Sequence, residues 1–161
     1  SDPDILGKLR EPALDFGWIV RRSLEIKSDI VAKDEFETTG LRATLNFGHT
    51  IGHAIEKCLN YERLLHGEAV AIGMVMEARL GEQLNITPEG SANQIAADCD
   101  RLGLPVELPS GLPVDEMLSA MRRDKKVLGS GFAFSLLTGV GTCKLCSDVD
   151  PGVVQRVIAS S

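Results

Sequence analysis

Apolar residues recur at helical spacing along most of the chain, and this pattern predicts a mainly α-helical fold. The longest amphipathic stretch covers residues 12–34, with Pro12 at the beginning, where a helix tolerates proline. Residues 66–84 are apolar almost all round in their first half, which is typical of a buried central helix. Further helices are predicted over residues 45–59, 88–101, 115–126 and 151–158.

Capping signals mark two of these helix starts. Thr87 stands before Pro88 and Asp150 before Pro151, so each start combines a capping side chain with a proline in the first turn. Short apolar runs separated by glycines, beginning at Phe132, predict a two-stranded β-hairpin before the last helix. Nothing in the sequence repeats, and we expect residues 1–161 to form a single helical domain with a small hairpin.

The hairpin's second strand carries Cys143 and Cys146 in a CxxC pattern. A structural zinc site normally needs a second pair of ligands, and residues three apart on a strand point to opposite faces. The pattern therefore favours neither a metal nor a redox role for this pair. Cys58 and Cys99 stand alone in helical patterns and are interpreted as small buried apolar residues.

Amino-acid composition and net charge limit the classes of protein that fit this sequence. The 161 residues are 43% hydrophobic but only 4% aromatic, which fits a core built from aliphatic side chains. A formal net charge of −6 argues against nucleic acid as a partner, because nucleic-acid binding surfaces are basic. No apolar run is long enough to span a bilayer, and the polar N-terminal residues lack a signal-peptide pattern. We expect a cytoplasmic protein without a membrane partner.

The candidate chemistry lies between Thr44 and Met74, a stretch that contains all three histidines of the chain. His49 and His53 are four residues apart, which places both imidazoles on one face of a helix. His66 opens the next apolar helix.

Glycines adjoin these imidazoles: Gly48 and Gly52 each precede one, and Gly67 follows another. Glycine within a helix costs about 1 kcal/mol relative to alanine, so its presence here predicts close backbone approach by another helix or by a ligand.

Neutral imidazole is a good ligand for zinc and similar divalent ions, and a catalytic zinc keeps three protein ligands and one open position. Three histidines can fill those places, although a carboxylate from elsewhere is an equally good third ligand. The plainer interpretation of each single histidine is a hydrogen-bonded core residue. The spacing does not decide which of the three would bind an ion.

Several motifs of this stretch closely resemble the C-terminal domain of the 3-dehydroquinate synthase family. They are residues 37–42, Asn46, the segment GHTIGHAIE at 48–56 and the segment HGEAVAIGM at 66–74. Residues 26–31 and 123–126 also fit the family in order and spacing. The resemblance covers nearly the whole chain and rests on long motifs without gaps.

This resemblance implies a multi-helical domain of a dehydroquinate synthase-like enzyme that normally follows an α/β domain with most of the NAD site. The present chain matches only the helical domain. We therefore expect NAD and Zn²⁺ or Co²⁺ as cofactors, the N-terminal NAD-binding domain as a partner, and a homodimer in the complete enzyme. The chain on its own is expected to be inactive, and no NAD-binding residue is assigned to it.

The resemblance also implies roles for individual residues. His49 and His66 match the two metal-binding histidines, and the third ligand, a glutamate, lies in the family upstream of the present residues. His53 matches a histidine at the substrate. The implied catalytic residues are His53, Glu37 and Lys27, and the implied substrate-binding residues are Lys27, Arg42, Asn46, His53, Lys125 and Lys126.

On the residues alone, several of these positions have plainer interpretations. Lys27 can extend to solvent, Arg42 and Asn46 can brace a helix end, and Lys125 or Lys126 can complement a helix dipole. Which of the two lysines contacts substrate stays open. Glu68 is expected to brace the histidine region rather than to bind a metal.

The activity implied is that of a lyase of the shikimate pathway, which converts 3-deoxy-arabino-heptulosonate 7-phosphate into 3-dehydroquinate and phosphate. Three alternatives differ in chemistry: a related sugar-phosphate cyclase, a metal-dependent glycerol or alcohol dehydrogenase, and a helical module without activity. Release of phosphate distinguishes the cyclases from a dehydrogenase, which produces NADH. A domain with no affinity for metal or substrate would indicate the helical module.

Overall fold

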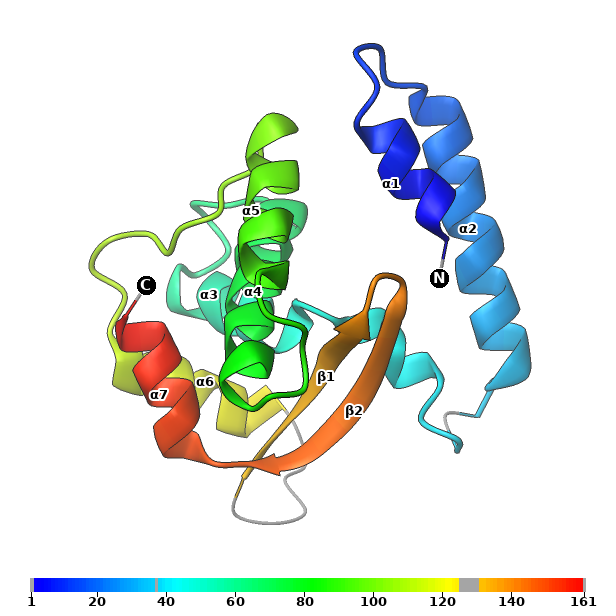
Figure 1. Cartoon of the computed structure of the whole chain (residues 1–161). Coiled ribbons are helices and arrows are strands. Elements are labelled where there is room, and N and C mark those ends of the chain that lie inside the picture. Colours follow the sequence, from blue (N-terminus) through cyan, green and yellow to red (C-terminus); the bar gives the residue numbers. More distant parts are fainter. Residues whose placement is uncertain (1, 37, 125–130, 161) are drawn as a thin grey trace.

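The computed structural model describes residues 2–36, 38–124 and 131–160, and it is mainly helical with one β-hairpin (Figure 1). This confirms the predicted fold class. In chain order the elements are α1 (Pro3–Leu9), α2 (Phe16–Lys33), the 3₁₀ helix η1 (Arg42–Asn46), α3 (His49–Cys58), α4 (His66–Gln83), α5 (Ser91–Arg101), α6 (Val114–Asp124), β1 (Phe132–Gly139), β2 (Thr142–Val149) and α7 (Pro151–Ala159).

Helix α4 is the centre of the fold, as its apolar sequence predicts. Its buried face contacts α3, α5, α7 and β1, so that one helix joins most of the other elements. Ile72, Met76 and Leu80 are almost completely buried along it. The core is completed by Ile51 and Ile55 of α3 together with side chains of α6, β1 and α7. The two helices that carry the histidines, α3 and α4, are therefore both anchored in the hydrophobic core.

The hairpin is antiparallel, with Ser135 opposite Leu145 in its regular part and irregular pairing toward both ends. Phe132, Phe134 and Leu136 of β1 are buried in the core, whereas β2 is largely exposed. The predicted hairpin is confirmed.

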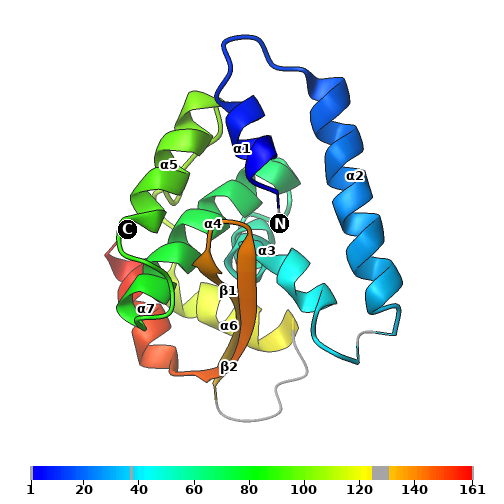
Figure 2. The ribbon, with the colours of Figure 1, turned by 45° about the vertical axis from the view of Figure 1, so that its right-hand side comes forward.

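Helices α1 and α2 run side by side next to this body (Figure 1), and α1 lies between α5 and α2 (Figure 2). No residue of α2 is fully buried, and Phe16, Val20 and Leu24 are exposed along it although the pattern gave this helix an apolar face. Helix α1 was not predicted from its polar sequence. It packs against α2, and the side chain of Arg10 just after it donates two hydrogen bonds to Asp98 of α5.

Some predicted helix starts are wrong. Helix α2 begins at Phe16, where Asp15 caps it, and not at Pro12. Helix α3 begins at His49, because Gly48 adopts a left-handed conformation with φ of 85° that separates it from η1.

Of the two predicted proline caps, one is wrong and one is confirmed. Thr87 does not cap α5, which begins at Ser91; its hydroxyl instead donates to the carbonyl of Leu137 in β1. Asp150 does cap α7, since its carboxylate accepts the N–H groups of Gly152 and Val153. Within the described residues, no helix combines the length and apolarity that crossing a membrane requires.

Candidate metal and substrate site

The three imidazoles converge in the folded chain. The ring centroid of His49 lies 5.5 Å from that of His53 and 5.5 Å from that of His66, and the centroids of His53 and His66 are 5.8 Å apart. His49 and His53 lie one turn apart on α3, as their spacing predicts, and His66 is the first residue of α4. Two helices that begin near one another therefore place the rings around one point.

Glycines allow the two helices to approach this closely. A Cβ atom on Gly73 of α4 would overlap the carbonyl oxygen of Gly48 and lie 2.8 Å from the nitrogen of Gly52. A Cβ atom on Gly48 would in turn lie 2.8 Å from the carbonyl oxygen of Val70. The prediction of close backbone approach is confirmed for Gly48 and Gly52, and the approaching group is helix α4. It is wrong for Gly67, where a Cβ atom would meet nothing within 4 Å.

Two of the three imidazoles have an oxygen atom within hydrogen-bond distance of Nδ1. The Nδ1 atom of His49 lies 3.3 Å from the carbonyl oxygen of Phe47, and that of His66 lies 3.1 Å from Oε1 of Glu56. A carbonyl oxygen can only accept, so His49 donates from Nδ1 and presents the lone pair of Nε2. The same tautomer of His66 donates to the Glu56 carboxylate. Metal-binding histidines are typically held by such a carbonyl or carboxylate behind the ring.

Sequence reasoning missed Glu56 as a member of this site. Its side chain is buried and lies three residues after His53 on α3, so the two share a helix face. Donor atoms of His53, Glu56 and His66 all lie within 4.8 Å of one another, a grouping that could hold a metal ion. The i,i+3 spacing was the available signal, but a glutamate in an amphipathic helix is usually exposed.

The electrostatics of the cluster favour neutral imidazole. Burial lowers the pKa of His49, and the nearby rings of His53 and His66 lower it further, against the raising effect of the Phe47 carbonyl and the Glu56 carboxylate. The neutral ring is the form that binds metal ions.

A cavity of about 360 Å³ opens at the cluster and is lined by His53, Glu56, Lys57, Tyr61, His66 and Ala120. The ring of His53 and the exposed ring of His66 therefore border space that a small ligand can enter.

Arg42 and Asn46 lie at the two ends of η1, directly before α3. The backbone N–H of Arg42 donates to the buried carboxylate of Asp34 over 3.0 Å, as do those of Thr38 and Thr39 over 2.9 Å and 3.0 Å. The N–H groups of Thr39 and Arg42 lower the pKa of Asp34 to about 2. Asp34 thus fixes the start of η1.

The remaining predicted residues are dispersed. Lys27 is exposed on α2 and is not among the residues that line the cavity at the histidines. Glu68 accepts the N–H of Leu65 over 2.7 Å and so braces the start of α4. Glu37, Lys125 and Lys126 lie outside the described residues.

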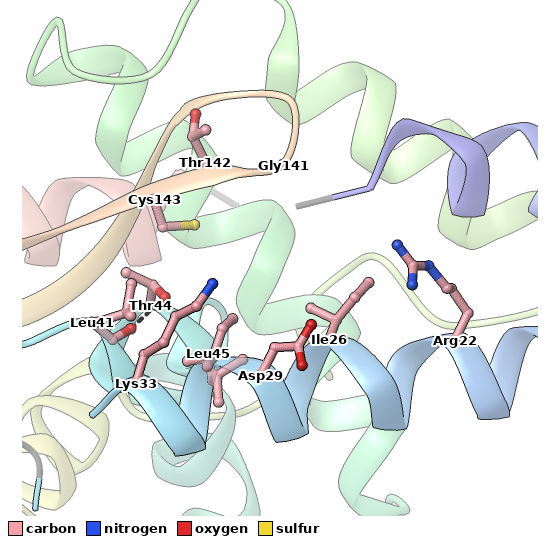
Figure 3. Close-up of a pocket in the computed structure, with 11 residues that line it drawn as sticks. Arg22, Ile26, Asp29, Lys33, Leu41, Thr44, Leu45, Gly141, Thr142 and Cys143 are labelled. Carbon is pink, nitrogen blue, oxygen red and sulfur yellow. Dashed lines mark hydrogen bonds between the residues drawn. The ribbon is translucent and has the colours of Figure 1, made fainter. Parts of the chain in front are cut away.

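A second cavity, of about 410 Å³, lies between α2, η1 and the turn of the hairpin (Figure 3). Asp29 and Lys33 extend from α2 toward Cys143 and the hairpin turn. Burial raises the pKa of the Cys143 and Cys146 thiols, which keeps them protonated and weakly nucleophilic. None of the three histidines lines this cavity.

The sequence matches the family model described as 3-dehydroquinate synthase C-terminal over residues 5–127. The chain belongs to this family. Its recognisable part begins in α1 and covers η1, α3 and α4, which carry the histidine cluster, Arg42 and Asn46.

Relatives in the family are named 3-dehydroquinate synthase. The enzyme of Acidithiobacillus ferrooxidans is 46% identical over 140 residues, which are 87% of this chain and 38% of that enzyme. That of Shewanella frigidimarina is 39% identical over 159 residues, 99% of this chain and 44% of the relative. The chain therefore spans about two fifths of the length of these relatives.

Two solved structures share the fold. A 2-deoxy-scyllo-inosose synthase, complexed with carbaglucose-6-phosphate, NAD⁺ and Co²⁺, matches with a TM-score of 0.74 and 24% identity over 88% of this chain and 40% of that one. A 2-epi-5-epi-valiolone synthase from Streptomyces hygroscopicus, with NAD⁺ and Zn²⁺ bound, matches with a TM-score of 0.73 and 23% identity over 88% of this chain and 39% of that one.

Proposed function

We propose that this chain is the metal- and substrate-binding part of a 3-dehydroquinate synthase. The complete enzyme would convert 3-deoxy-arabino-heptulosonate 7-phosphate into 3-dehydroquinate and phosphate, with NAD and a divalent metal ion. Family membership and relatives at up to 46% identity support this activity over that of the structural neighbours, which are below 25% identical. A carbon–oxygen lyase reaction with NAD held by an N-terminal domain follows from the same proposal.

The observation that carries the proposal is the pair of Nδ1 contacts at His49 and His66. Because Phe47 and Glu56 occupy Nδ1, both rings present Nε2 for a metal ion, with His49 neutral and half-buried. We assign His49 and His66 as the metal ligands and Glu56 as the carboxylate that orients His66. A carboxylate outside the present residues would be the third ligand, which matches the three protein ligands of a catalytic site.

A bound Zn²⁺ or Co²⁺ supplies Lewis acidity toward the alcohol and ketone oxygens of the substrate. The residues of this chain supply positioning. His53 borders the cavity beside the metal-binding rings, where an imidazole N–H can donate to a phosphate oxygen. Arg42 can hold a carboxylate or phosphate in two parallel hydrogen bonds, and Asn46 can both donate to and accept from sugar hydroxyls.

Proton removal does not require a strong base on this chain, because the phosphate of the substrate can accept the proton before it leaves. His53 would hold that phosphate in the orientation for elimination. Fixing the substrate in one reactive conformation and matching its negative charges are then the main contributions of these residues. Lys27, Glu37, Lys125 and Lys126 are proposed as further contacts to substrate.

The ligand assignment is tested by metal content. The chain is purified as wild type and as His49→Ala, His53→Ala and His66→Ala. Each is mixed with the N-terminal domain of a family member, which would supply the third ligand, and titrated with Co²⁺ while the visible absorption is recorded. We expect His49→Ala and His66→Ala to lose binding by at least about tenfold and His53→Ala to keep it. Binding that survives in His49→Ala but not in His53→Ala would instead assign the metal to His53, Glu56 and His66.

The activity is tested by phosphate release from the heptulosonate phosphate with NAD and Zn²⁺. The chain is assayed alone and mixed with the N-terminal domain of a family member. We expect release only in the mixture, and its loss in His53→Ala. Accumulation of NADH without phosphate would indicate a dehydrogenase, and release from a different sugar phosphate would indicate a related cyclase. No turnover in a folded mixture would contradict the proposal.

A further inference from the structure

Glu77 is a buried carboxylate at the junction of the two helices that carry the histidines. Its side chain has 0% exposure, and it lies on α4 one turn after Gly73, where the helices are closest. Burying a carboxylate is unfavourable unless hydrogen bonds compensate for the lost water. The contacts of this side chain therefore indicate what it stabilises.

Those contacts reach the beginning of α3. Oε2 of Glu77 accepts the N–H of Gly48 over 2.8 Å, and Oε1 accepts the N–H of Ile51 over 3.1 Å. Gly48 is the N-cap of α3 and Ile51 its third residue, so these are N–H groups that no carbonyl within the helix can accept. The carboxylate also lies at the positive end of the helix dipole.

Helix α3 needs this external partner because of its glycine cap. An N-cap residue usually accepts these N–H groups with its own serine, threonine or aspartate side chain. Gly48 has none, and its φ of 85° and its contacts with Val70 and Met74 leave no space for one. The close approach of the helices thus removes the local cap, and Glu77 from α4 replaces it.

We propose that Glu77 is a positioning residue for the histidine cluster, and this rests on the proposed metal site. His49 lies between the two N–H groups that Glu77 accepts, and His66 begins the helix to which Glu77 belongs. The carboxylate therefore sets the relative position of His49 and His66, whose ring centroids are 5.5 Å apart.

The chain offers a matched control on the same helix. Glu82 of α4 accepts the N–H of Ala92 over 2.9 Å, near the beginning of α5, which carries no histidine. Glu77→Gln and Glu82→Gln each replace one carboxylate oxygen by an NH₂ group that cannot accept. Glu77→Gln keeps one acceptor oxygen for two N–H groups and so loses at least one hydrogen bond at the start of α3. Glu82→Gln makes the same change of charge but keeps an acceptor oxygen for its single N–H partner, so it controls for the loss of a carboxylate on α4.

Two readouts are taken on the full chain: Co²⁺ affinity with its visible absorption spectrum, and amide hydrogen exchange without metal. For Glu77→Gln we expect exchange at Gly48 and Ile51 to rise roughly tenfold, Co²⁺ affinity to fall about 10–100-fold, and the spectrum to change. For Glu82→Gln, which keeps an acceptor oxygen for the N–H of Ala92, we expect smaller changes in exchange and a Co²⁺ affinity within about twofold of wild type.

Unchanged exchange at Gly48 and Ile51 in Glu77→Gln would overturn the proposal, as would an unchanged Co²⁺ affinity and spectrum. If wild type binds no Co²⁺ even with the N-terminal domain of a family member added to supply the third ligand, the proposed metal site fails, while the exchange data still decide whether Glu77 holds the start of α3. If Glu77→Gln does not fold, Glu77→Asp, which keeps both oxygens on a shorter side chain, is judged by the same criteria.

Discussion

Replacement of Gly73 by alanine tests whether close contact between α3 and α4 is the basis of the site. The added methyl group would overlap the carbonyl oxygen of Gly48 and lie 2.8 Å from the nitrogen of Gly52. Both neighbours are backbone atoms of α3, so they cannot rotate away as a side chain would. The two helices must separate, or the chain around Gly48 must change conformation.

The expected cost follows from these contacts. Overpacking of a core costs about 1–3 kcal/mol. Separation also stretches the two hydrogen bonds to Glu77, and a hydrogen bond to a charged group is worth about 1.5–3 kcal/mol. The better helix propensity of alanine returns at most about 1 kcal/mol. We expect Gly73→Ala to lower the free energy of unfolding by about 3 kcal/mol, which is a large fraction of the stability of a typical domain.

The assay is equilibrium unfolding in urea, monitored by circular dichroism, together with Co²⁺ titration of the folded protein. Gly67→Ala is the matched control, because Gly67 is on the same helix and a Cβ atom there meets nothing within 4 Å. We expect that variant to be as stable as wild type or slightly more so. Gly73→Ala with a free energy of unfolding within about 1 kcal/mol of wild type and unchanged Co²⁺ affinity would refute the close-contact reasoning.

Two further predictions concern single polar groups. The N–H groups of Thr39 and Arg42 lower the pKa of Asp34 to about 2 in the folded state, below its unfolded value near 4. The ionised Asp34 side chain therefore contributes its full stabilisation above about pH 4, and this stabilisation is lost as the pH falls through 2. Unfolding in urea at pH 7 and pH 2.5 should therefore show Asp34→Asn clearly less stable than wild type at pH 7, with a smaller difference at pH 2.5. Equal differences at both pH values would contradict this. Thr87→Val removes the hydroxyl that donates to the Leu137 carbonyl and should lower the free energy of unfolding by about 1–3 kcal/mol in the same assay. Thr138→Val, at an exposed position, should lower it less. Similar losses of stability in both variants would contradict the role of this hydrogen bond.

The sequence predicted the helical fold and the histidine stretch because both depend on local patterns. Spacing of apolar residues is sufficient to identify α4, and the spacing of His49 and His53 is sufficient to place them on one face. The glycines beside them indicated close backbone approach. Helix boundaries were wrong where the local pattern was ambiguous. Thr87 has the sequence signature of a cap, but its hydroxyl donates to a carbonyl of β1, and α5 begins four residues later, at Ser91.

The buried carboxylates could not be predicted in this way. Asp34, Glu56 and Glu77 all stand in stretches where charged residues are usually exposed. Two of them accept backbone N–H groups, of Arg42 and neighbouring residues in one case and of Gly48 and Ile51 in the other. Nearly every residue has a backbone N–H, so the sequence does not indicate which of these groups a given carboxylate accepts. Only the folded chain shows these pairs.

These three carboxylates have a common consequence for the candidate site. Asp34 holds the start of the element that carries Arg42, Glu77 holds the start of the helix that carries His49, and Glu56 holds the ring of His66. Each acts on a group with a proposed substrate or metal contact, and each does so through charge-assisted hydrogen bonds, which are directional and stronger than neutral ones. Apolar packing alone fixes helices less specifically, because it tolerates small shifts and substitutions of similar volume. The buried charge therefore restricts the orientation of the histidines and of Arg42 beyond what the aliphatic core provides.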